Sequence, residues 1–158
     1  MHMLGDMTVA RSKRSAAPAV IVRFLDNPAI LLIARICVTL PFIVSGLSKL
    51  YDWHAGESEM LRSGLHPAWV FALAVTATQL AGSILIVANR GLWIGAGVLG
   101  VFTVLTTFIA HRFWELSGDA RTTQLNSFLE HWTMSAAFVL VAVVYLRDRR
   151  SRTAQGSH

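Results

Sequence analysis

Charge is scarce in this chain. Only 15% of its 158 residues are Asp, Glu, Lys or Arg, whereas 54% are apolar. Ordinary globular domains carry about 25% charged residues. A single domain of this length could not cover a water-facing surface with so few charges, which excludes a soluble globular protein. The high apolar content also excludes a disordered chain, because disordered segments are poor in apolar residues.

Cysteine is almost absent, and several cofactor motifs are missing. The single Cys37 excludes an internal disulfide and any C-x-x-C redox or zinc motif, and we expect it to be a small core residue. The sequence contains no H-x-x-x-H motif and no E-x-x-H pair, which disfavours a di-iron site in a helix bundle. It also contains no nucleotide-binding fingerprint.

Four apolar runs, each near 20 residues long, dominate the sequence. They cover roughly residues 29–50, 69–88, 92–113 and 128–146. At about 1.5 Å per residue, each run can cross a hydrocarbon layer of about 30 Å as a helix. Lipid cannot satisfy backbone polar groups, and period-two alternation is absent, so helices are expected rather than strands. The sequence therefore predicts an all-α polytopic membrane protein whose domain, residues 28–146, is a four-transmembrane-helix bundle.

Basic residues flank this domain on both sides and give a net charge of +5. The positive-inside rule places residues 1–27 and 147–158 in the cytoplasm, and the connections 51–68 and 114–127 on the outer side. Because the charges gather at the chain ends, they favour contact with anionic lipid over a nucleic-acid partner. The flanking basic residues are Arg11, Lys13, Arg14, Arg23, Arg147, Arg149, Arg150 and Arg152.

Three residues of the first span have expected roles in topology. Arg35 lies about 10 Å inside, and we expect its guanidinium to snorkel to the cytoplasmic surface rather than form a buried ion pair. Pro41 should kink the helix near mid-membrane. Lys49 lies at the outer end and is expected to snorkel there. Small residues four apart, such as Gly91 and Gly95, predict close helix packing, within one chain or in a homo-oligomer.

Polar side chains recur at helical spacing in the outer halves of the spans. We infer a polar cavity that opens outward. Alternatively, the hydroxyls bond to carbonyls of their own helix and nothing lies between the helices. That alternative does not explain Gln79, Glu130, His111 or His131, because amide and ionisable groups at membrane depth are costly and usually functional. The polar residues are Ser45, Ser48, Thr76, Gln79, Ser83, Thr103, Thr107, His111, His131 and Ser135.

His111 and His131 lie near the outer ends of consecutive spans and are expected to approach each other. We expect them to be interfacial or structural before functional, and otherwise to relay a proton, bind a quinone carbonyl or bind a metal. Two histidines are slender support for haem, and no metal ligand set is predicted. Trp114 belongs to an aromatic belt or stacks on a flat ring. The predicted ligand-binding residues are Gln79, His111, Trp114, Glu130 and His131.

Short motifs in the four spans resemble a known family. The first span reads RICVTLPFIVSGLSKL, the second ends in QLAGSILIVANRG, the third ends in FIAHRFW and the fourth begins FLEHWTMSAAFVL. Their order and spacing resemble the DoxX family of four-helix bacterial inner-membrane proteins. That pattern usually has glutamate where this chain has Gln79 and asparagine where it has His131. The resemblance implies an inner-membrane location and, for some members, association with quinone-linked or redox-defence proteins.

Three functions remain open at this stage. The first is a membrane subunit that anchors an oxidoreductase partner and binds a quinone or another small ligand in the outward cavity. The second is a non-catalytic scaffold or receptor for a partner protein or lipid. The third is a small transporter that acts as an oligomer, because four helices form a poor continuous pathway.

Overall fold

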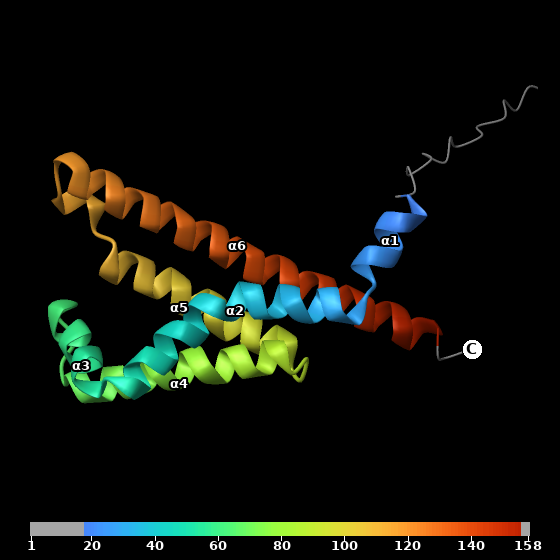
Figure 1. Cartoon of the computed structure of the whole chain (residues 1–158), viewed down its shortest axis with the longest axis horizontal. Helices are drawn as coiled ribbons and strands as arrows, with labels where there is room; N and C mark the ends of the chain where they lie inside the picture. Colours follow the sequence, from blue (N-terminus) through green and yellow to red (C-terminus); the bar gives the residue numbers. More distant parts are fainter. Residues whose placement is uncertain (1–17, 156–158) are drawn as a thin grey trace, which may run out of the picture.

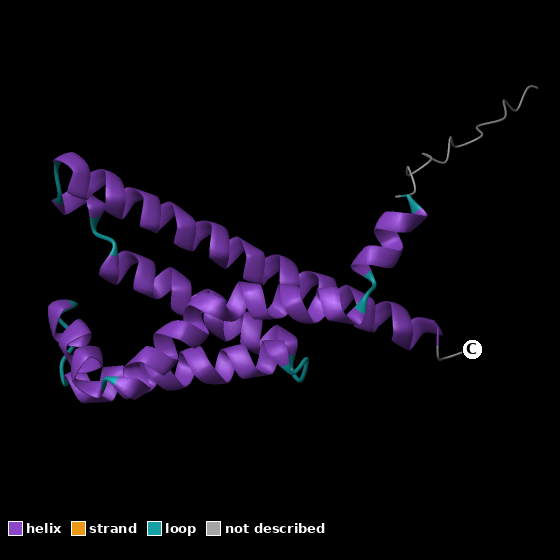
Figure 2. Cartoon of the chain, viewed as in Figure 1, coloured by secondary structure: helices purple, strands orange, loops and turns teal. Residues whose placement is uncertain are grey.

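Helices make up nearly all of the part of the chain that the structure describes. The structure is a computed structural model and describes residues 18–155. No strand occurs among these residues (Figure 2), which confirms the all-α prediction. The elements are α1 (Ala19–Leu25), α2 (Pro28–Tyr51), α3 (Trp53–Arg62), α4 (Ala68–Val87), α5 (Leu92–Ala110), the 3-10 helix η1 (Phe113–Glu115) and α6 (Gly118–Gln155).

Four of these segments are long and apolar enough to cross a membrane, as predicted. They are α2, α4, Leu92–Glu115 and α6. Contacts join α2 to α4, α4 to α5, and α5 to α6. In Figure 1, α1 and the C-terminal end of α6 lie at one end of the molecule, the α1 end. The helix α3 and the connection between α5 and α6 lie at the opposite end, the α3 end.

Local sequence explains where α2 begins and why it bends. The Oδ1 of Asn27 accepts a hydrogen bond from the Ala29 amide at 2.9 Å, and Pro28 occupies the first turn, where no amide donor is needed. Pro41 lies inside the helix and lacks the N–H that the helical ladder requires. The helix changes direction along its length in Figure 1, in agreement with the predicted kink.

The connection 51–68 contains a helix that the sequence did not predict. Asp52 begins α3 by accepting a hydrogen bond from the Ala55 amide at 2.9 Å. The helix is short and amphipathic, and it buries Gly56 and Met60 while it packs on α2 and α4. This connection therefore covers the end of the bundle instead of extending away from it.

The core lies where α2, α4, α5 and α6 meet. Its buried apolar residues are Phe42, Ile86, Ala96, Leu99 and Phe138. The rings of Phe42 and Phe138 lie 5.5 Å apart and join α2 to α6. Small residues let α4 and α5 approach closely, as predicted: a Cβ atom on Gly95 would lie 2.7 Å from the backbone oxygen of Gly82.

The structure differs from the sequence-based expectations at Cys37 and in the length of α6. Cys37 is exposed on α2, so the prediction that it belongs to the core was wrong. The helix α6 has 38 residues, a length of about 57 Å. It therefore starts well before the predicted span 128–146 and takes up most of the predicted tail 147–158. The basic residues Arg11, Lys13 and Arg14 lie outside the described residues.

Candidate functional site

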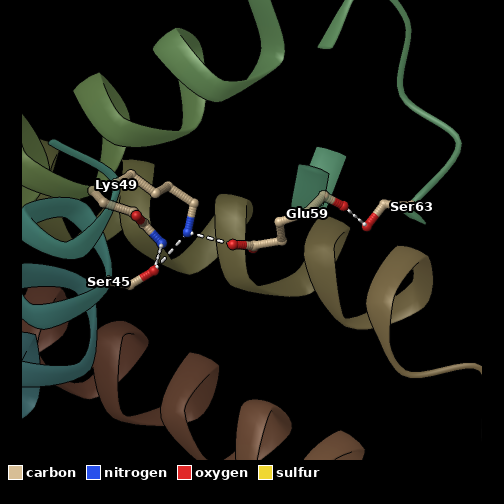
Figure 3. Close-up of polar contacts among 5 residues, drawn as sticks. Ser45, Lys49, Glu59 and Ser63 are labelled. Atoms are coloured by element: carbon tan, nitrogen blue, oxygen red, sulfur yellow. Dashed lines mark hydrogen bonds and ion pairs between the residues drawn. The ribbon is translucent and has the colours of Figure 1, made fainter. Parts of the chain in front are cut away.

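Lys49 is buried at the α3 end and forms an ion pair with Glu59, whose side chain is half-exposed. The Lys49 side chain is 6% exposed, and its Nζ lies 2.8 Å from the Oε2 of Glu59. The same Nζ donates to the Oγ of Ser45 at 3.0 Å (Figure 3). The prediction that Lys49 snorkels to the surface was wrong, because α3 folds back and brings a carboxylate to the ammonium. The ion pair ties α3 to α2.

Gln79 extends this network into the bundle. Its Nε2 donates to the Ser45 Oγ at 3.2 Å, so α4 joins α2 through one hydroxyl. The Oε1 of Gln79 and the Oγ1 of Thr76 are buried and have no hydrogen-bond partner within residues 18–155. An unsatisfied buried polar atom costs about 1–3 kcal/mol. The sequence predicted Gln79 as a ligand-binding residue but did not reveal that it shares the Ser45 hydroxyl with Lys49.

The other buried hydroxyls mostly face their own helices. Ser83 donates to the carbonyl of Gln79, and Thr103 donates to that of Leu99. Thr107 donates to the carbonyl of Thr103, and Ser135 donates to that of His131, each one turn back along its own helix. These four hydroxyls thus bond to carbonyls of their own helices, which is the alternative to a polar cavity that the sequence left open.

His111 and His131 lie together, as the sequence predicted. Their ring centroids are 4.5 Å apart. The Nδ1 of His111 lies 2.7 Å from the Oε1 of Gln124, and the Nδ1 of His131 lies 2.7 Å from the backbone oxygen of Ser127. A backbone carbonyl oxygen only accepts hydrogen bonds, so the Nδ1 of His131 donates to Ser127. In the neutral imidazole, the Nε2 of His131 then keeps a lone pair that can accept a hydrogen bond. The roles of the ring nitrogens of His111 follow its tautomer.

The other two predicted ligand residues form no hydrogen bond, ion pair or ring contact with this pair within residues 18–155. Trp114 is 50% exposed and contacts the rings of Phe113 and Phe128. Glu130 is exposed on α6, and its side chain forms no hydrogen bond or ion pair with the residues that the structure describes. Arg35 is half-buried on α2.

A cleft of about 370 Å³ opens at the α3 end, between α3 and the connection from α5 to α6. Two of its lining residues also take part in the polar contacts described above. Glu59 pairs with Lys49, and Gln124 contacts His111. Sequence reasoning missed this cleft, since it depends on the fold of α3. Its polar lining consists of Glu59, Arg62, Ser63, Arg112, Glu115 and Gln124.

The fold and these clusters define a four-helix membrane-spanning protein with a polar site at one end. The DoxX family model matches residues 30–112, more than half of the chain, and the chain therefore belongs to the DoxX family. The inner membrane protein YphA of Escherichia coli (strain K12) is 29% identical over 126 residues, which cover 77% of this chain and 90% of that protein. No solved structure matches. The matched range includes Lys49, Gln79 and His111, while His131 lies beyond it.

Proposed function

We propose that this chain is an inner-membrane subunit of a redox-linked system and that its histidine pair binds the headgroup of a quinol, the reduced form of a quinone. The relative with an inner-membrane name supports the location. The basic residues that flank the bundle favour cytoplasmic termini, with the α3 end on the periplasmic side.

The proposal is carried by the hydrogen bond of His131. Its Nδ1 lies 2.7 Å from the Ser127 carbonyl oxygen, which can only accept, so Nδ1 is the donor and the Nε2 of the neutral ring is the acceptor. A quinol presents hydroxyl donors, whereas the oxidised quinone presents only carbonyl acceptors. The site therefore favours the reduced form. Its depth also fits, because His111 ends α5 and His131 lies just inside the apolar part of α6.

A partner completes the redox function. The sequence carries no nucleotide fingerprint, so a cofactor of the oxidoreductase that this chain anchors would take the two electrons of the quinol, and its two protons would be released as the quinone forms. The chain's own contribution is to hold the headgroup and accept its hydrogen bond at Nε2 of His131. A non-catalytic scaffold would keep the partner but would not bind the quinol.

Removal of the His131 imidazole should weaken quinol binding by about tenfold or more, the equivalent of one hydrogen bond of about 1.4 kcal/mol. The measurement is titration of the purified protein in detergent with a short-tailed ubiquinol, followed by quenching of tryptophan fluorescence. We expect His131→Ala to lose affinity and His54→Ala, whose side chain is 95% exposed on α3, to keep it.

Two results would overturn the proposal. One is equal affinity of the wild type and both variants for the quinol. The other is no quinone in organic extracts of the wild-type protein purified from quinone-containing membranes, together with no binding in the titration.

A further inference from the structure

We propose that the cleft at the α3 end binds the phosphate of a phospholipid headgroup through Arg62 and Arg112. This site is distinct from the histidine pair and does not depend on the proposed quinol function. Neither histidine is among the residues that line the cleft.

Both arginines of the cleft keep N–H groups that have no hydrogen-bond partner within residues 18–155. Glu59 is already paired with Lys49 at 2.8 Å. Arg112 makes two long contacts, from its Nε to the Ile109 carbonyl at 3.3 Å and from its Nη1 to Glu115 at 3.5 Å, and its side chain is 45% exposed. Arg62 forms no hydrogen bond or ion pair through its side chain within residues 18–155. The two guanidinium groups come from different walls, one at the end of α3 and the other shortly after α5.

Gln124 adds a third donor. Its Oε1 lies 2.7 Å from the Nδ1 of His111. Its amide nitrogen has no hydrogen-bond partner within residues 18–155, and the residue lines the cleft. Two guanidinium groups and an amide N–H match an anion with several oxygens. Arginine is the side chain best suited to phosphate, because its planar fork can donate two hydrogen bonds at once.

The position and the apolar lining select a lipid over a soluble anion. Ile109 and Ala110 lie in the last turn of α5, and they line the same cleft as the arginines. The cleft thus lies at the level where a spanning helix ends and the headgroups begin. With Leu116, these residues form an apolar side along which the glycerol and the first acyl carbons can lie. A free phosphate would leave that side unused.

The test is native mass spectrometry of the full chain in detergent, titrated with phosphatidylglycerol. We expect one tightly retained lipid and a loss of affinity of about tenfold or more in the double variant Arg62→Gln, Arg112→Gln. Arg121→Gln is the matched control, because Arg121 is exposed at the same end and lies outside the cleft lining. Diacylglycerol, which lacks the phosphate, should not be retained.

Circular dichroism of each variant checks that the bundle is still folded. Of the two single variants, Arg62→Lys should bind the lipid more tightly than Arg62→Gln, because lysine keeps the positive charge. Equal lipid retention by the wild type and the double variant would overturn the proposal. Displacement of the lipid by inorganic phosphate at equal concentration would also overturn it, because the site would then belong to a soluble anion.

Discussion

Replacing Glu59 with glutamine should destabilise the protein by about 3 kcal/mol. The substitution removes the carboxylate but leaves the Lys49 ammonium on a side chain that is only 6% exposed. Breaking a buried ion pair from one side costs about 3–5 kcal/mol. We expect the lower end of that range, because the Glu59 side chain is 49% exposed and water can reach the broken pair. The measurement is unfolding by SDS titration in mixed micelles.

Two comparisons separate the buried charge from a general effect of the substitution. Glu115→Gln makes the same chemical change in an exposed pair with Arg112 and should cost less than about 1 kcal/mol. Adding Lys49→Met to Glu59→Gln should recover most of the lost stability, because the unpaired charge is removed as well. If the double variant were as unstable as Glu59→Gln alone, the buried ammonium would not be the cause.

Adding one methyl group at Gly95 should destabilise the bundle by about 1–3 kcal/mol. In Gly95→Ala, the new Cβ would lie 2.7 Å from the Gly82 backbone oxygen and 2.9 Å from the Cγ1 of Ile86. The first of these contacts is with backbone, so it cannot be relieved by a change of rotamer. The helices α4 and α5 must separate, which is the usual cost of overpacking. Thermal unfolding in detergent measures the change.

Gly97→Ala is the matched control two residues further along the same helix. Apart from its chain neighbours and the backbone of its own helix, no atom lies within 4 Å of a Cβ at this position. Alanine has a higher helix propensity than glycine, so this variant should be neutral or up to about 1 kcal/mol more stable. A loss of stability in Gly97→Ala equal to that in Gly95→Ala would contradict close packing at Gly95.

The sequence predicted the spans because their signal is local. An apolar run of the length of a span, such as 69–88, is by itself typical of a membrane-crossing helix. The close approach of His111 and His131 followed from their places at the ends of consecutive spans. Pro41 likewise acts on its own helix. These predictions required only the length of a span and the chemistry of one residue or one short connection.

The parts that the sequence missed depend on how distant segments fold together. Lys49 looked like a terminal residue with access to water, because nothing in its own span shows that α3 folds back over it. The hydroxyls that suggested a cavity lie on the predicted faces, but most of them bond to their own helix. Glu130 is next to His131 in sequence, yet neighbouring residues on a helix point in different directions, and it is exposed.

The most direct measurement of the central claim is ¹⁵N magnetic resonance of histidine-labelled protein in lipid, with His131 assigned by its loss in His131→Asn. We expect the His131 ring to carry its proton on Nδ1, and the Nε2 resonance to move when quinol is added but not when the oxidised quinone is added. A proton on Nε2 in the neutral ring, or an Nε2 resonance that does not respond to quinol, would contradict a quinol site at this histidine.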